Sequence, residues 1–244
     1  MHHLVVEHWS QGASPLHRRD PRAKILALLV FLVAVATAHR ALPVLFAVLL
    51  LMLAGGLLWA RLPVGGALVR AALVLPFTLV FALIAWWAGD PGRGLSLVAK
   101  SYLSALAVLL VVSTTPLPSL LSGFAQAGAP SFLLLVAQFL YRYLFVIAAE
   151  AQHMSKAAAA RGASARKWVA GGPQFRAAAG ALAVLFARSY CRAEHIQRAM
   201  LARGFEGRFQ PMEATHFRGG DAAFAIVASL APVLLRIGAE RAAR

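Results

Sequence analysis

Two copies of one hexapeptide are the residues of this 244-residue chain best suited to a specific chemical role. Residues 157–162 and 199–204 share the pattern Ala-x-x-Ala-Arg-Gly and begin 42 residues apart. Each copy stands where a helix is expected to end, because a glycine just past a helix adopts the left-handed conformation and a basic residue in the last turn favours the helix dipole. That structural role alone explains a single copy. Two copies in matched settings present two guanidinium groups, which suits docking onto a symmetric partner with two equivalent grooves. We therefore predict six docking residues: Ala160, Arg161, Gly162, Ala202, Arg203 and Gly204.

Histidines and carboxylates near the N-terminus are the residues that suggest a metal site. They are His2, His3, Glu7, His8, His17 and Asp20. None of them has the His-Glu-x-x-His spacing that places two histidines on one helix face, and the segment is rich in helix breakers. An arm at the membrane interface is therefore the favoured interpretation, and we predict no metal ligands in this chain.

The remaining acidic residues do not favour an enzyme. Lipid or isoprenoid chemistry in a membrane usually needs clustered carboxylates for Mg²⁺, whereas the acids in the polar part of the chain are scattered singly: Glu150, Glu194, Glu206 and Glu213. A carrier that works alone needs polar residues along a path through the membrane, and the first three apolar segments hold little beyond Thr37 and Thr78. Cys191 is the only cysteine, which excludes an internal disulfide and suggests a packing residue.

The composition is that of a membrane protein. Hydrophobic residues make up 60% of the chain and charged residues 14%, against about 25% charged in a soluble domain. The net charge of +15 is better explained by basic residues at the cytoplasmic face, and by a partner with an acidic surface, than by nucleic acid.

Apolar segments of roughly the 20 residues needed to cross a bilayer predict about five transmembrane helices in an all-α integral membrane protein. The first four are expected at residues 24–38, 41–59, 67–88 and 95–113, and a fifth, shorter one at 222–238. Asp20 is placed to cap the first helix and Pro21 to begin it, while Lys24 is expected to extend its charge to the lipid headgroups. Pro76 predicts a kink in the third segment, and Trp86 and Trp87 mark its interfacial end.

The loop charges predict the orientation. Arg18, Arg19, Arg22 and Lys24 place the N-terminal arm in the cytoplasm, with no cleavable signal peptide ahead of it. Five spans then put the C-terminus outside, where Arg236, Arg241 and Arg244 conflict with the positive-inside rule. Either the basic block before this segment overrides the rule, or residues 222–238 do not cross.

Residues 114–221 contain 12 of the 24 Lys and Arg residues and five acidic residues, which is too polar for a membrane-spanning block. Two long amphipathic helices are expected there, at residues 131–161 and 174–203, separated by Gly171, Gly172 and Pro173. The predicted organisation is thus a cytoplasmic arm (1–22), a four-helix membrane part (23–113), a cytoplasmic two-helix domain (114–221) and a last membrane helix with the C-terminus (222–244).

Several of these segments together resemble a known family. They are the arm Ser14-Pro15-Leu16-His17-Arg18-Arg19-Asp20-Pro21-Arg22-Ala23-Lys24, then Thr114-Thr115-Pro116, Tyr141-Arg142-Tyr143-Leu144-Phe145 and the two Ala-Arg-Gly motifs. In this order they resemble the transmembrane T component (EcfT) of energy-coupling-factor (ECF) ABC transporters, and more narrowly the CbiQ-like branch of cobalt and nickel importers. The resemblance extends from residue 14 to about residue 210, and the twin motifs are its most specific part.

The resemblance implies a division of labour among subunits in a bacterial cell (inner) membrane. The two long helices would cross as coupling helices, and Arg161 and Arg203 would insert into grooves of two ABC ATPase subunits. Those subunits would bind ATP and Mg²⁺, and a separate substrate-binding membrane subunit would bind Co²⁺ or Ni²⁺. This chain would be no enzyme and would hold no cofactor, in agreement with the lack of a Gly-x-x-x-x-Gly-Lys-Ser/Thr loop in its sequence. A vitamin importer of the same general kind is the alternative.

Overall fold

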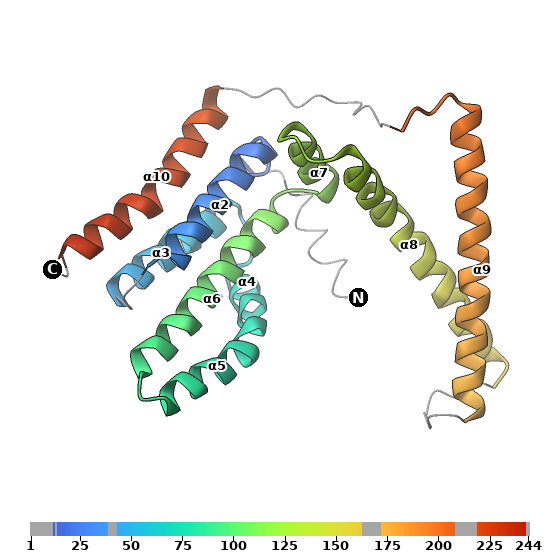
Figure 1. The fold of residues 1–244 in the computed structure, drawn as a ribbon, viewed down its shortest axis with the longest axis horizontal. Helices are drawn as coiled ribbons and strands as arrows, with labels where there is room; N and C mark the ends of the chain where they lie inside the picture. Colours follow the sequence, from blue (N-terminus) through green and yellow to red (C-terminus); the bar gives the residue numbers. More distant parts are fainter. Residues whose placement is uncertain (1–11, 13, 39–42, 163–171, 208–218, 243–244) are drawn as a thin grey trace. The chain divides into compact units, whose positions relative to one another are not determined.

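The computed structural model describes residues 12, 14–38, 43–162, 172–207 and 219–242. Every regular element within these residues is a helix (Figure 1). The chain divides into two compact units: the bundle unit, formed by residues 1–127 and 212–244, and the two-helix unit, formed by residues 128–211. The expected all-α class is confirmed.

The bundle unit contains the helices expected to lie in the membrane, together with one more. Its elements are α2 (Pro21–Ala36), α3 (Pro43–Trp59), α4 (Val64–Ala71), the 3₁₀ turn η1 (Ala72–Val74), α5 (Leu75–Trp87), α6 (Pro91–Ser113), α7 (Leu117–Gln126) and α10 (Gly219–Ala242). The two-helix unit contains α8 (Ser131–Ala160) and α9 (Pro173–Ala202). Helix α7 was not predicted, because the prolines and glycines around residues 116–128 are typical of a loop.

Helix α2 begins as its sequence predicts. Asp20 is the N-cap, and its carboxylate accepts a hydrogen bond from the Arg22 backbone N–H at 2.9 Å. Pro21 occupies the first helical position, where its missing N–H costs nothing. The apolar core then forms where α2, α3 and α6 meet, around side chains such as Phe31, Leu57 and Leu106.

Contacts at both ends of α2 define how α2 and α6 run. At the start of α2, Lys24 Nζ lies 3.0 Å from the carbonyl oxygen of Thr114, just past the end of α6. At its other end, Lys100 Nζ in the first half of α6 donates to the carbonyl of Ala36 at 3.1 Å. Helix α6 therefore runs antiparallel to α2.

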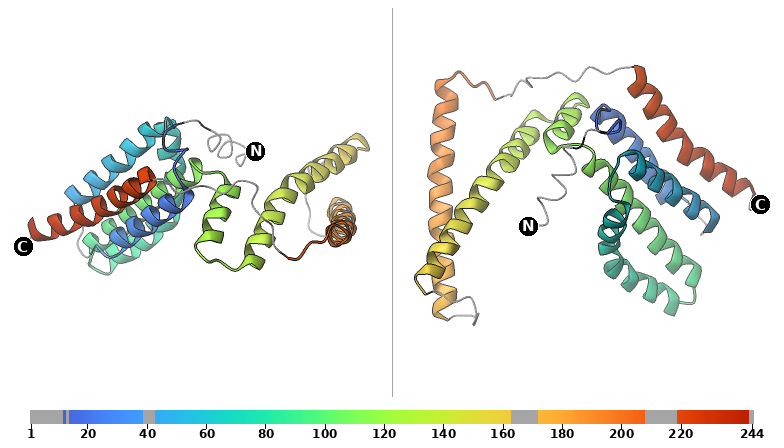
Figure 2. Two further views of the ribbon diagram at one scale, coloured as in Figure 1. Left: turned by 90° about the horizontal axis from the view of Figure 1, so that it is seen from above. Right: turned by 180° about the vertical axis from the view of Figure 1, so that it is seen from behind.

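Helix α10 runs parallel to α2. The Arg19 guanidinium, just before α2, lies 3.4 Å from the Asp221 carboxylate at the start of α10. Near the far end, Arg236 of α10 donates a hydrogen bond to the hydroxyl of Thr37, the C-cap residue of α2. Figures 1 and 2 show the two helices side by side along their lengths. The start of α10 therefore lies at the same end of the bundle as the start of α2, and its end lies at the opposite end.

The interpretation of Lys24 as a residue that reaches the lipid headgroups is wrong. Its side chain is buried, with 2% of the residue exposed, and its ammonium donates both to Thr114 O and to Thr115 Oγ1, at 3.0 and 2.9 Å. The physical reason is that the end of α6 offers two oxygen acceptors beside the first turn of α2. A buried ammonium is stabilised by such partners.

The third apolar segment is distorted where a kink was expected. The 3₁₀ turn η1 separates α4 from α5 directly before Pro76, which stands in the first turn of α5. After α5 the chain reverses into α6, and the two helices approach closely at Gly94. A Cβ atom on Gly94 would lie only 2.8 Å from the carbonyl oxygen of Ala82, so glycine is what allows these backbones to meet.

Four described stretches are long and apolar enough to cross a bilayer: Val64–Trp87, Pro91–Ser113, Ser131–Ala160 and Gly219–Ala239. The segment expected at 222–238 is thus part of a helix of sufficient length. Helices α2 and α3, with 16 and 17 residues, are shorter than the roughly 20 residues that span a bilayer. Helix α8 qualifies by length and apolarity although its second half carries Glu150 and Lys156.

Candidate functional site

The two Ala-Arg-Gly motifs end two helices of equal length, α8 and α9, each of 30 residues. Arg161 is the C-cap of α8 with φ −89° and ψ 11°, and Arg203 is the C-cap of α9 with φ −94° and ψ 10°. Gly162 and Gly204 follow with φ of 85° and 75°, the left-handed region that favours glycine. The expected helix endings are confirmed, and their backbones are nearly identical.

Hydrogen bonds show why both endings have the same geometry. The N–H of Gly162 donates to Ala159 O at 3.0 Å, and the N–H of Gly204 donates to Leu201 O at 3.0 Å. The α9 ending adds a bond from Phe205 N–H to Met200 O at 3.1 Å, which completes a Schellman motif. Carbonyls that a helix end leaves without partners are thereby satisfied, and the direction of the chain around each arginine is fixed.

All six predicted docking residues are exposed within the described chain. They are Ala160, Arg161 and Gly162 at the end of α8, and Ala202, Arg203 and Gly204 at the end of α9. Because the residues beside each arginine are alanine and glycine, the backbone of another protein can approach each arginine closely.

The structure does not bring the two arginines together. Helices α8 and α9 run in opposite directions (Figures 1 and 2). They are joined by an ion pair between the Arg188 guanidinium and the Glu150 carboxylate. Arg161 lies eleven residues beyond Glu150, and Arg203 lies fifteen residues beyond Arg188. At a rise of 1.5 Å per residue the two arginines are roughly 30–40 Å apart, at opposite ends of the helix pair.

An apolar groove of about 400 Å³ lies between α8 and α9. Its walls are formed by the facing sides of the two helices: Val136, Phe139, Leu140, Tyr143, Ile147, Ser189, Arg192, Ala193, Ile196 and Met200. The rings of Phe139 and Tyr143 stack at 6.0 Å between centroids, so the motif that begins at Tyr141 contributes an aromatic wall. The predicted amphipathic character of α9 is confirmed by this packing.

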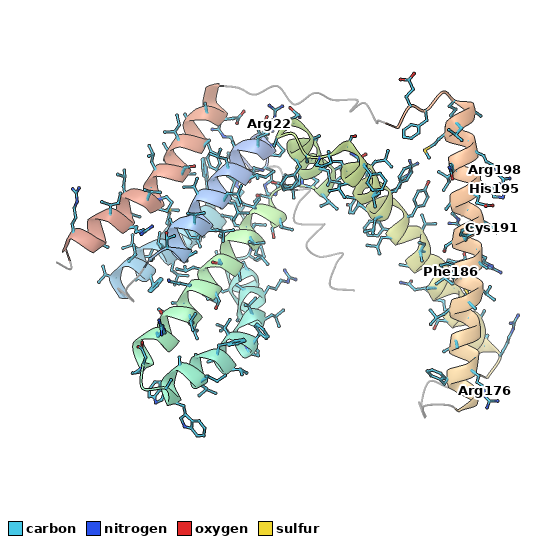
Figure 3. All side chains as sticks on the ribbon, viewed as in Figure 1. Arg22, Arg176, Phe186, Cys191, His195 and Arg198 are labelled. Atoms are coloured by element: carbon cyan, nitrogen blue, oxygen red, sulfur yellow. The ribbon has the colours of Figure 1, made fainter. Side chains whose placement is uncertain are left out.

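One exposed side of α9 carries polar residues together with Phe186, which is 73% exposed. Figure 3 shows Cys191, His195 and Arg198 along one side of the helix. Cys191 is exposed, so its interpretation as a packing residue within this chain is wrong; it lines an open hollow together with Arg188 and with Glu150 of α8.

The described part of the chain contains no cluster of side chains that could hold a metal ion. No three His, Cys, Asp or Glu side chains among the described residues lie together as metal ligands would. His17 instead forms a 2.6 Å hydrogen bond between its Nδ1 and the Ser14 hydroxyl, which closes the turn before α2. The candidates His2, His3, Glu7 and His8 lie outside the described residues.

Two polar contacts were not expected from the sequence. The Glu150–Arg188 ion pair was missed, although the two residues occupy the polar sides of two amphipathic helices, which is the signal that could have paired them. The buried set around Lys24 was also missed, because its partner Thr114 is 90 residues away along the chain. The Thr-Thr-Pro sequence that follows α6 was the signal from which oxygen acceptors at this helix end could have been predicted.

Comparison with known proteins adds a family to this geometry. The family model of CbiQ, described as a cobalt transport protein, matches residues 12–214. Two relatives, each named energy-coupling factor transporter transmembrane protein EcfT, are 28% identical over 234 residues (Bacillus selenitireducens) and 29% identical over 232 residues (Acidaminococcus fermentans), covering 84% of both chains in each case. The cobalt transport protein CbiQ of Rhodobacter capsulatus is 30% identical over 122 residues, 49% of this chain and 48% of the relative.

Proposed function

Because the chain belongs to the CbiQ family of cobalt transport proteins, we propose that it is the transmembrane coupling (T) subunit of an ECF-type ABC importer. In this role it transmits motion from two ATPase subunits to a substrate-binding membrane subunit. The observation that carries the proposal is the pair of exposed helix endings with matched backbone geometry at Arg161 and Arg203. Two equivalent ATPase subunits would present two equivalent grooves, and the separation of the two endings suits one arginine for each.

Docking is assigned to the six exposed residues at the ends of α8 and α9. Each guanidinium would bind acidic or carbonyl oxygens in an ATPase groove, and the adjacent alanine and glycine would admit the groove wall. ATP and Mg²⁺ would be held by the ATPase subunits and not by this chain. The apolar groove between α8 and α9 supports the further assignment that these helices contact a membrane partner.

The chain is a multi-pass membrane protein. We place it in the bacterial cell (inner) membrane with the N-terminal arm and the two-helix unit in the cytoplasm, where the ATPase subunits act. In this arrangement α8 lies at the cytoplasmic side although it is apolar enough to span, because its charged second half leads to the docking motif at Arg161.

The proposed substrate is Co²⁺ or Ni²⁺, which the substrate-binding subunit would bind. Support comes from the CbiQ family match and from the R. capsulatus relative, which is named a cobalt transport protein. Two longer matches are to proteins named EcfT, without a substrate in the name, so a vitamin is the second candidate. Uptake of each metal and of vitamins by the assembled complex decides between them.

Charge reversal at the two arginines tests the docking assignment. Arg161→Glu and Arg203→Glu are each expected to weaken co-purification with the ATPase subunits at least thirtyfold, since removing one partner of a buried charge pair costs about 2–5 kcal/mol. The double variant should abolish uptake while it still inserts into the membrane. Arg93→Glu, an exposed arginine in the first turn of α6, is the matched control and should leave assembly unchanged. Normal uptake by the double variant would refute the assignment.

A further inference from the structure

Residues 19–24 contact two segments of the bundle unit that flank the two-helix unit in the sequence. On the outgoing side, Lys24 Nζ donates to Thr114 O at 3.0 Å and to Thr115 Oγ1 at 2.9 Å. These threonines follow α6 and lead through α7 toward α8. On the returning side, Arg19 Nη1 lies 3.4 Å from Asp221 Oδ1 in the first turn of α10.

Apart from the half-buried Arg19 side chain, which is 32% exposed, the groups in these contacts are buried. Exposed fractions are 2% for Lys24, 1% for Thr114, 3% for Thr115 and 5% for Asp221. Burial disfavours the charged form of the Lys24 ammonium, and the nearby carboxylates of Asp20 and Asp221 favour it. A buried charge in a membrane protein is costly, and it persists where its partners and its role require it.

Close backbone approaches hold the same two places. A Cβ on Gly123 of α7 would lie 3.2 Å from Pro21 Cβ and 3.3 Å from Ile25 Cδ1, so α7 rests directly on the first turn of α2. A Cβ on Gly220 would lie 2.7 Å from Arg19 Nη1, so this guanidinium lies against the backbone where α10 begins. Hydrogen bonds, an ion pair and tight packing thus act at one location.

We infer that Arg19, Asp20 and Lys24 form a connector clamp, which fixes to the start of α2 the two bundle segments that flank the two-helix unit in the sequence, so that movement of that unit is transmitted to the membrane helices. This inference rests on the proposed coupling function. Loosely held connections would absorb a displacement of α8 and α9 locally. Flanking segments fixed at one point would carry α2 with them, and α6 and α10 pack on α2.

The coupling ratio, meaning substrate transported per ATP hydrolysed, separates a transmitting role from a purely structural one. Lys24→Met removes the ammonium and keeps an unbranched apolar side chain. The measurement uses the complete complex with its ATPase subunits and Co²⁺, or whichever substrate the wild type transports. This variant should still hydrolyse ATP, while the coupling ratio falls. The expected decrease is about tenfold, the factor that corresponds to the loss of a charge-assisted hydrogen bond. Thr115→Val, which removes only the hydroxyl acceptor, should lower the ratio less. An unchanged ratio in Lys24→Met overturns the inference.

A charge exchange provides a second, independent arm should Lys24→Met fail to assemble. Arg19→Asp and Asp221→Arg each place like charges together at the returning connection, and each should lower the coupling ratio. The double variant restores an opposite pair and should recover most of the ratio. Arg18→Asp, the exposed neighbour with the same charge change, is the control and should behave as wild type. A double variant no better than either single variant overturns the clamp.

Failure of the clamp and failure of the proposed function have different signatures. A wild-type complex without ATP-dependent uptake would refute the proposed function and would leave the clamp to be judged on the purified full-length chain. There, amide hydrogen exchange should be about tenfold faster than in wild type over residues 114–126 in Lys24→Met and over residues 219–224 in Arg19→Asp, because each variant loses one charge-assisted contact. Equal exchange would refute the clamp even if transport is confirmed.

Discussion

At the scale of single residues, the informative feature is that the predicted docking residues are exposed and contribute mainly backbone contacts within this chain. Arg161 and Arg203 are exposed and make helix-ending backbone contacts, and the glycines beside them adopt a conformation that side chains disfavour. The chemistry of these positions is therefore directed outward. Buried Lys24 is the opposite case, because its ammonium donates hydrogen bonds to Thr114 and Thr115 inside the molecule.

The left-handed glycines should control where the arginines point. Gly204→Val is expected to cost about 1–2 kcal/mol at the helix end, because a β-branched residue is strained at φ 75°. It should weaken co-purification with the ATPase subunits although Arg203 is still present. Gly204→Asn should be tolerated, since asparagine adopts this conformation more readily.

Gly180 supplies the control for that experiment. It lies exposed inside α9, and a Cβ added to it would have no atom within 4 Å, so Gly180→Ala should stabilise the helix by about 1 kcal/mol. Hydrogen exchange of α9 and binding to the ATPase subunits are measured for both variants. Opposite effects of the two substitutions would show that the backbone conformation at Gly204, and not the added side-chain volume, is responsible. Equal binding by Gly204→Val and wild type would contradict the prediction.

At the scale of elements, the hairpin of α5 and α6 depends on one close approach. Gly94→Ala places a Cβ 2.8 Å from the Ala82 carbonyl oxygen, which the backbone cannot avoid without moving. The expected cost is about 1–3 kcal/mol, the usual range for forcing extra atoms into a packed site. Thermal unfolding of the detergent-purified chain should show a lower Tm.

Gly92→Ala is the matched control for the hairpin. It lies two residues earlier in the same helical turn, and its Cβ would have Asp90 Oδ1 as nearest neighbour at 3.7 Å, an ordinary contact. Its Tm should stay close to that of wild type. A Gly94→Ala variant as stable as Gly92→Ala would show that the α5–α6 approach is looser than described.

Helix positions were largely predictable from the sequence because apolar runs and breakers are local signals. The expected limits of α8 and α9, 131–161 and 174–203, differ by one residue from Ser131–Ala160 and Pro173–Ala202. The motif endings at Arg161 and Arg203 were predictable for the same reason. Helix α7 was missed because Pro116, Pro118 and Gly128 are typical of loops, although Pro118 is compatible with the first turn of a helix.

Contacts between distant segments were not predictable. Nothing local to Lys24 shows that Thr114 and Thr115 lie beside it, so burial could not be distinguished from contact with headgroups. The count of five spans predicted the direction of α10, but not that α10 packs beside α2. Arg236 donates a hydrogen bond to Thr37 at the far end of α2. This contact gives a basic residue a polar partner on the side of the membrane where the positive-inside rule disfavours it.

At the scale of the whole chain, the parallel packing of α2 and α10 predicts on which sides of the membrane the termini lie. With the N-terminal arm in the cytoplasm, Arg241 near the end of α10 should face outside. A single cysteine at Arg241→Cys in a Cys191→Ser background should react with a membrane-impermeant maleimide in intact cells. A cysteine at Arg18→Cys in the same background should react only after permeabilisation.

Native Cys191 is an internal control for this topology. It is exposed on α9, so the proposed cytoplasmic location predicts no labelling in intact cells and strong labelling in permeabilised ones. Labelling of Arg18→Cys and Arg241→Cys from the same side would contradict the parallel packing. Labelling of Cys191 from outside would contradict the cytoplasmic placement of the two-helix unit.

The pairing of α2 with α10 also has a consequence for biosynthesis. Arg19 and Asp221 are 202 residues apart, and Thr37 and Arg236 are 199 residues apart. At a synthesis rate of about 5–20 residues per second, α2 waits roughly 10–40 s on the ribosome for the helix that covers it. During that interval the flank of α2 that later meets α10 must be covered by lipid or by the insertion machinery. We expect nascent chains that stop before residue 219 to be early substrates of membrane proteases.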